Sequence, residues 1–162
     1  MGEGVESSVL DLAITPLGLA GVSVGESLDA VVARLGAPTI RRPDSDSPDE
    51  NVEILEYGPF VVIAVDGVVD GVMALEGYRG ETLGGVYVGM PWTDLLARYP
   101  GVFFEEGRFA WRLPGWPHLD LEVSRPLHED EVADEGSWTE EWFEISDPED
   151  SFVSLIVVTL GT

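Results

Sequence analysis

One stretch of this sequence occurs twice, and that repetition constrains the fold more than any other feature. Residues 21–35 read GVSVGESLDAVVARL and residues 85–99 read GVYVGMPWTDLLARY, so the two stretches lie 64 residues apart. In each stretch the apolar residues recur at i, i+3, i+4 and i+7, which is typical of one face of an amphipathic helix. The sequence therefore predicts two copies of a unit in which a glycine-containing segment leads into a helix.

Capping and terminating residues mark the ends of both predicted helices. Ser27 is suited to cap the amino end of the first helix, and Gly36 followed by Pro38 ends it. In the second copy Pro91 takes the place of Ser27, and a Pro-Gly pair at residues 100–101 ends the helix. The helical units are thus short and sharply bounded.

Runs rich in Val, Ile and aromatic residues follow each predicted helix. In the first copy they cover residues 52–57, 60–65 and 68–75, and Asp66-Gly67 between the last two is a strong hairpin signal. Residues 41–51, with two prolines and several acids, indicate an exposed loop. In the second copy the strand candidates are residues 102–104, 108–113, 118–123 and 152–160. The predicted fold is therefore α+β: two tandem repeats of a helix plus antiparallel sheet that form one pseudo-symmetric domain.

The repeat also sets the predicted division of the chain. Residues 1–15 are expected to form an N-terminal leader or edge strand, residues 16–80 the first α+β repeat, and residues 81–162 the second. The spacing between presumed matching hairpins exceeds the repeat spacing by about 20 residues, so the second repeat is expected to carry an insertion at about residues 126–150.

The predicted insertion combines acidic and aromatic residues. It contains no lysine or arginine, and its tryptophans distinguish it from a purely disordered charged segment. Carboxylates attract a basic partner and aromatic faces accept guanidinium groups, so we predict a partner-binding surface here. The simpler alternative is a solvated loop with one or two tryptophans folded back on the core. Trp111 and Trp116 lie before the insertion, on either side of Pro114-Gly115 in an expected hairpin where both could be exposed. The candidate residues are Trp111, Trp116, Trp138, Trp142, Glu129, Asp130, Glu131, Asp134, Glu135, Glu140 and Glu141.

The net charge of −23 narrows the classes of partner. Nucleic-acid phosphate and anionic lipid would be repelled, so neither is expected to bind. A basic protein is the expected partner, while the oligomeric state stays open. All eight basic residues are arginine, and a salt-adapted or GC-rich proteome would explain the composition equally well.

The motifs of catalysis and of metal binding are missing from the sequence. It has no nucleophile elbow, phosphate-binding loop or dinucleotide fingerprint, and its two histidines are not at metal-ligand spacing. We therefore expect neither an enzyme nor a bound cofactor or metal. With no cysteine, no basic signal segment and no apolar run of about 20 residues, the chain is expected to be cytoplasmic.

The G-V-x-V-G segment followed by a helix, repeated in tandem, resembles the β-lactamase inhibitory protein family and, more distantly, small outer-membrane assembly lipoproteins. The matching residues are Gly21, Val22, Val24, Gly25, Ser27, Leu35 and Gly36 in the first copy, and Gly85, Val86, Val88, Gly89, Met90 and Leu95 in the second. The resemblance implies two stacked units whose sheets join into one concave, protein-gripping face. The disulfides of the inhibitors and the acylated cysteine of the lipoproteins have no counterpart here, so β-lactamase itself is not implied as the target.

These observations predict a non-enzymatic protein-binding inhibitor, such as an immunity-type protein that neutralises a basic toxin or enzyme. The alternative is a structural or housekeeping interaction module whose acidity reflects its proteome.

Overall fold

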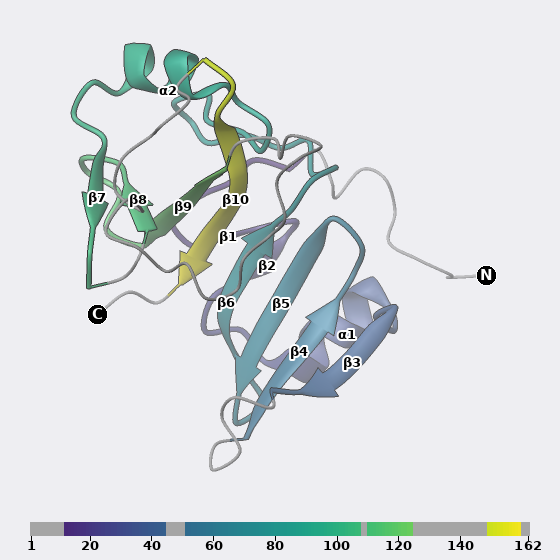
Figure 1. Ribbon diagram of the computed structural model, residues 1–162. Helices are drawn as coiled ribbons and strands as arrows, with labels where there is room; N and C mark the ends of the chain where they lie inside the picture. The colour runs from purple at the N-terminus through teal and green to yellow at the C-terminus, as the bar shows by residue number, and fades with distance from the viewer. Residues whose placement is uncertain (1–11, 45–50, 108–109, 125–148, 160–162) are drawn as a thin grey trace, which may run out of the picture.

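A single large antiparallel sheet and two short helices confirm the α+β class in the computed structural model, which describes residues 12–44, 51–107, 110–124 and 149–159 (Figure 1). The sheet has eight strands in the order β3-β4-β5-β6-β10-β9-β8-β7, and a separate two-stranded sheet pairs β1 with β2. The elements are β1 (Gly18–Leu19), β2 (Val22–Ser23), α1 (Leu28–Leu35), β3 (Ile40–Pro43), β4 (Val52–Glu56), β5 (Phe60–Val65), β6 (Val68–Ala74), α2 (Trp92–Arg98), β7 (Phe103–Glu105), β8 (Ala110–Arg112), β9 (Leu119–Ser124) and β10 (Phe152–Thr159).

The pairing of β6 with β10 joins the two halves of the chain into one sheet. Met73 pairs with Val157 at the middle of this contact, where the teal strand β6 lies beside the yellow strand β10 in Figure 1. Strands β3 to β6 lie on one side of this junction and strands β7 to β10 on the other. We call these four-stranded parts the first and second half-sheets.

The connections before the two central strands differ greatly in length. Asp66 and Gly67 alone connect β5 to β6, and both have positive φ (52° and 79°), as a type I′ turn requires. The predicted hairpin is therefore confirmed. Residues 125–151 make the corresponding connection from β9 to β10, which is where the sequence predicts an insertion.

Each of the two strands at the centre of the sheet, β6 and β10, contains a bulge at a corresponding position. In β6, Asp70 is the extra residue between the pairs Val69–Ala64 and Gly71–Ile63. In β10, Ser154 is the extra residue between the pairs Val153–Val123 and Leu155–Glu122. A bulge bends its strand and changes the direction of the neighbouring side chains, and this happens at the corresponding place in both half-sheets.

The glycine segments before both helices are held by the same backbone hydrogen bonds. Gly25 donates its N–H to Val69 (2.8 Å), and Gly89 donates to Val153 (2.7 Å). Both glycines have strongly positive φ (92° and 98°), which explains their recurrence in the repeat. The segment thus fastens each helix to the central strand of its own half-sheet.

The first helical N–H groups are capped by backbone atoms and not by the predicted serine. Ser27 occupies the N-cap position of α1 but makes no side-chain cap bond. Leu28 instead donates its N–H to the Gly67 carbonyl (2.9 Å), and Trp92 at the start of α2 donates to Ser151 (2.8 Å). The sequence could not reveal this cap because the acceptors come from distant strands.

Both helices pack on one face of the large sheet. Fully buried Val31 of α1 and Leu95 of α2 belong to one hydrophobic cluster with inward residues of the strands, including Phe60 and Leu121. In Figure 1, α1 lies behind the first half-sheet. No helix in the described ranges is long and apolar enough to cross a membrane.

Two predictions concern segments at the edge of the fold: the loop from residue 41 is wrong in part, and the leader strand is described only in part. Residues 40–43 form the edge strand β3, although the sequence predicts a loop from residue 41; pairing with β4, including Arg41 with Leu55, overrides the proline and charge signals. Of the predicted leader strand, Ile14 is buried and forms a parallel bridge with Thr82. Residues 1–11 lie outside the described ranges.

Candidate binding face

Within the described residues, the sheet face opposite the helices carries no helix. We call it the open face. Directly paired residues of an antiparallel sheet point to the same side, so the pairs define a row across this face. The row consists of Ile40, Glu56, Val61, Met73, Val157 and Asp120.

The first half-sheet gives the open face an apolar centre. Val61, Ile63 and Val65 of β5 alternate with the inward residues of that strand and therefore lie on the open face, where Val61 is buried and Ile63 and Val65 are half-buried. Met73 of β6 pairs with Val61 and is half-buried. Val157 of β10 continues this apolar surface across the junction.

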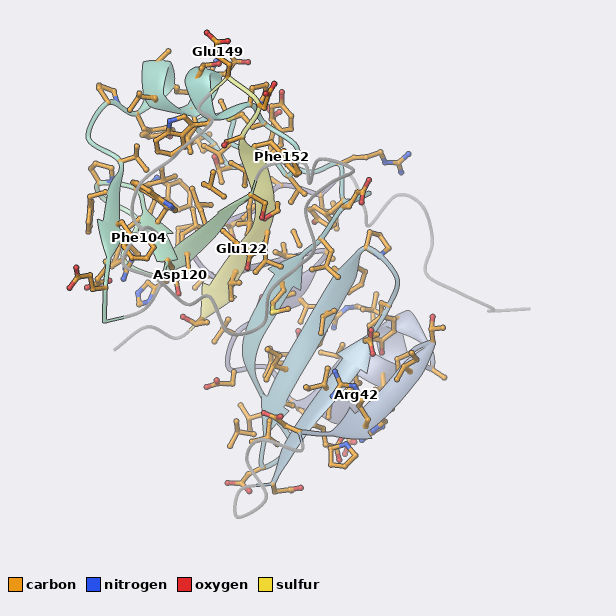
Figure 2. All side chains as sticks on the ribbon, viewed as in Figure 1. Arg42, Phe104, Asp120, Glu122, Glu149 and Phe152 are labelled. Atoms are coloured by element: carbon orange, nitrogen blue, oxygen red, sulfur yellow. The ribbon has the colours of Figure 1, made fainter. Side chains whose placement is uncertain are left out.

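The second half-sheet gives the same face an acidic part. The outward residues of β9 are Asp120, Glu122 and Ser124, which stand where β5 has Val61, Ile63 and Val65. Figure 2 shows Asp120 and Glu122 along β9, with Arg42 at the far edge of the sheet. Apolar and anionic surfaces thus adjoin on one continuous sheet.

Glu122 is exposed and contacts serines of the bulge. Its Oε1 atom accepts a hydrogen bond from Ser154 Oγ (3.2 Å), and Ser124 Oγ lies 2.8 Å from Ser154 Oγ. No cation pairs with Glu122 among the described residues. Its charge is therefore available to a cationic group from outside the described chain.

Asp120, by contrast, already has a cationic neighbour. Arg112 is nearly buried, and its Nε lies 3.3 Å from Asp120 Oδ1 while its Nη1 lies 2.5 Å from Glu105 Oε2. Arg112 also donates to the carbonyl of Pro117. This arginine braces β7, β8 and the start of β9, whereas Glu122 has no arginine partner among the described residues.

Two tryptophans predicted to bind a partner pack against the core instead of standing exposed. Trp111 lies 4.9 Å from Trp92 and 5.4 Å from Phe104, measured between ring centroids. Trp116 is half-buried against the same cluster. Trp111 pairs with the inward Leu121, so its ring points to the helical side of the sheet. A direct role of either ring in binding stays a prediction.

The other predicted binding residues lie outside the described ranges. They are Trp138, Trp142, Glu129, Asp130, Glu131, Asp134, Glu135, Glu140 and Glu141. The described structure ends at Ser124 and resumes at Glu149, so the predicted insertion is attached at the β9–β10 end of the sheet. That end is also where Glu122, Ser124 and Ser154 lie.

Sequence reasoning missed β9 as part of the candidate binding face. The available signal was its alternation, LDLEVS, in which Leu119, Leu121 and Val123 alternate with Asp120, Glu122 and Ser124. Only the strand order shows that this polar series lies on the same sheet as the apolar series of β5, with β6 and β10 between them.

Metal binding finds no support in the part of the chain that the structure describes, where no three His, Asp or Glu side chains gather in a suitable arrangement. Comparisons with protein-family models, with curated proteins and with solved structures each returned no match for this chain. The resemblance to the inhibitor family therefore stays a prediction.

Proposed function

We propose that this chain is a non-enzymatic inhibitor that binds a basic protein through the open face of its sheet, in the manner of an immunity protein acting in the cytoplasm. The observation that carries the proposal is the division of this face: half-buried, apolar Ile63 on β5 is matched by exposed, acidic Glu122 on β9. An apolar centre supplies contact area, and adjoining carboxylates select a cationic partner.

The net charge supports the same kind of partner. At −23, the chain attracts basic proteins over long range and repels polyanions. Association should therefore be fast at low salt and slow as salt screens the attraction. A basic enzyme whose active surface binds phosphate would be blocked by such a face.

We also infer that the two half-sheets and their helices are tandem copies of one unit. Support comes from the recurring Gly25 and Gly89 bonds, the matching bulges at Asp70 and Ser154, and the central Met73–Val157 pair. Joining two such units edge to edge doubles the area of the open face. We propose that the face is concave, as the family resemblance implies.

Binding to basic proteins encoded by neighbouring genes tests the proposal. Each candidate would be titrated against the full chain by calorimetry at low and physiological salt, with its enzymatic activity measured in parallel. We expect one candidate to bind, to lose activity, and to bind more weakly as salt rises. Tight binding whose affinity does not depend on salt concentration, or no binding to any protein of the panel, contradicts the proposal.

Two charge-reversal variants test whether the open face is the surface that binds the partner. Glu122→Lys on the open face should weaken binding about tenfold or more, since it introduces like-charge repulsion with a basic partner. Asp29→Lys changes the net charge equally but lies exposed on α1, on the other side of the sheet. If both variants weaken binding equally, only the net charge matters and the open face is not the site.

A further inference from the structure

On the acidic part of the open face, a carboxylate and an aromatic ring lie on neighbouring strands. Phe152 of β10 pairs with Ser124 of β9, and Leu155 of β10 pairs with Glu122. Phe152 and Glu122 are therefore diagonal neighbours on the same face, a spacing that aromatic and long side chains bridge. Figure 2 shows both residues on these adjoining strands.

The Phe152 ring belongs to the open face and not to the core. Val153 and Ile156 of the same strand are fully buried in the hydrophobic cluster, whereas Phe152 is half-buried and is not part of that cluster. In the ranges that the structure describes, the ring packs against no other aromatic ring. It therefore keeps aromatic surface for a group from another molecule.

Hydroxyl groups hold the Glu122 carboxylate by one of its two oxygens. Oε1 accepts a hydrogen bond from Ser154 Oγ at 3.2 Å, and Ser124 Oγ lies 3.5 Å from the same atom. Neither hydroxyl bonds to Oε2, and no arginine of the described ranges pairs with this exposed side chain. The carboxylate is thus oriented in advance and keeps one oxygen for an external donor.

The corresponding place in the first half-sheet has neither the ring nor this carboxylate. Counted from the two bulges, Phe152 corresponds to Val68 and Glu122 corresponds to Ile63, both aliphatic. The bulge residue Asp70 supplies an exposed acid there, but no aromatic residue accompanies it at the position of Phe152. The first half-sheet therefore offers a control of equal charge.

We propose that Glu122 and Phe152 together bind an arginine side chain of the basic partner, which rests on the inhibitor function proposed above. A guanidinium is planar, so its edge donates to Oε2 of Glu122 while its face lies on the Phe152 ring. A lysine ammonium is more strongly hydrated and has no planar face. The net charge of −23 attracts either cation, but a carboxylate beside a ring favours arginine.

Three peptides that differ only in the central side chain test this preference. They are acetyl-Val-Arg-Val-amide, its lysine counterpart, and its citrulline counterpart, which keeps the shape of arginine without the charge. Each is titrated into the ¹⁵N-labelled full chain at low salt while the amide signals of Glu122, Ser124 and Phe152 are followed. The arginine peptide should bind about two- to fivefold more tightly than the lysine peptide, as an exposed cation–π contact provides. The citrulline peptide should shift these signals little.

Matched variants separate the ring from the charge. Phe152→Leu should abolish the preference for arginine over lysine, because it keeps an apolar side chain but removes the ring, whereas Phe152→Tyr should retain it. Glu122→Gln should weaken both charged peptides. Asp70→Asn removes the same charge from the first half-sheet and should weaken them far less. Circular dichroism checks the fold of each variant, and the peptide comparison on the unchanged chain needs no variant.

The proposal is overturned if no peptide shifts the signals of Glu122 and Phe152, or if the lysine or citrulline peptide binds as tightly as the arginine peptide. It is also overturned if a folded Phe152→Leu variant retains the preference. These outcomes leave the inhibitor proposal standing, because a basic partner can bind the open face through other cations. Conversely, an arginine preference at this site without a basic protein that binds in calorimetry would refute the inhibitor and not the arginine site.

Discussion

Strands β5 and β9 are each the second strand from the β6–β10 junction, and they resemble one another on the inward side but not on the outward side. Inward residues stay apolar and buried in both, with Phe60 and Val62 matched by Leu119 and Leu121. Outward residues change from apolar Ile63 to acidic Glu122. The shared core fixes the sheet, while the outward positions are free to acquire a specific surface.

The ion pairs between the two outer strands of each half-sheet also differ in which strand carries the acid. In the first half-sheet Arg42 of β3 lies 3.6 Å from Glu56 of β4. In the second half-sheet Glu105 of β7 pairs with Arg112 of β8, so the acid and the base have exchanged strands. Both half-sheets therefore have a cross-strand ion pair between their two outer strands, with the charges reversed.

The largest expected effects come from the matched core positions. Phe60→Ala should cost about 3–5 kcal/mol and Leu119→Ala about 2–5 kcal/mol of unfolding free energy, since each leaves a cavity. Urea unfolding would be followed by tryptophan fluorescence and by far-ultraviolet circular dichroism. All five tryptophans lie in the second half of the chain.

The position of the tryptophans makes Phe60→Ala the informative variant. If the β6–β10 pairing joins both half-sheets into one cooperative unit, this change in the first half must lower the fluorescence midpoint of the second. A fluorescence midpoint that stays fixed while the dichroism midpoint falls would show that the halves unfold independently.

We expect a loss of stability of intermediate size when the ion pairs of the outer strands are broken, and a different loss for each pair. Arg112→Gln removes a nearly buried cation and leaves Glu105 and Asp120 without it, so we expect a loss of about 3 kcal/mol. Glu56→Gln breaks the matching pair where both side chains are substantially exposed, so we expect less than about 1 kcal/mol. Equal losses in urea unfolding would mean that burial does not distinguish the pairs.

Local patterns predicted the elements that depend on neighbouring residues. The helices, the Asp66-Gly67 hairpin and the run of β5 at residues 60–65 follow from periodicity and turn chemistry. Edge strand β3 was missed because its pairing with β4 overrides an unfavourable local sequence. Strand β8 ends at Arg112, one residue before the predicted end, and the predicted start at residues 108–109 lies outside the described ranges.

The candidate site was harder to predict because it depends on strand order. Trp111 looked like a surface residue beside a turn, yet its pairing with Leu121 turns the ring toward the core. Glu122 attracted no attention as one acid among 31. Its importance comes from lying on the same face as Ile63, which no local pattern reveals.

The smallest expected effect is a difference in how the free energy of unfolding depends on pH when Arg34 or Arg98 is replaced. Hydrogen bonding by Arg34 is the main cause that lowers the pKa of Glu26 from its ordinary value of 4.5, against an opposing effect of burial. The pair therefore stabilises the fold above that value, and the stabilisation is lost as pH falls through the lowered native pKa. Arg34→Gln should cost a few tenths to about 1 kcal/mol at neutral pH, because the pair is partly exposed.

Arg98→Gln is the control for this comparison because it changes the net charge equally and removes a contact to a carbonyl that does not titrate. The cost of Arg34→Gln, measured by urea unfolding from pH 7 down to pH 3, should shrink as Glu26 is protonated, whereas that of Arg98→Gln should change less. Parallel pH profiles would mean that general charge repulsion dominates both sites. Diverging profiles would establish that the carboxylate of Glu26 makes Arg34 a stabilising, pH-dependent pair, whereas the carbonyl contact of Arg98 is not.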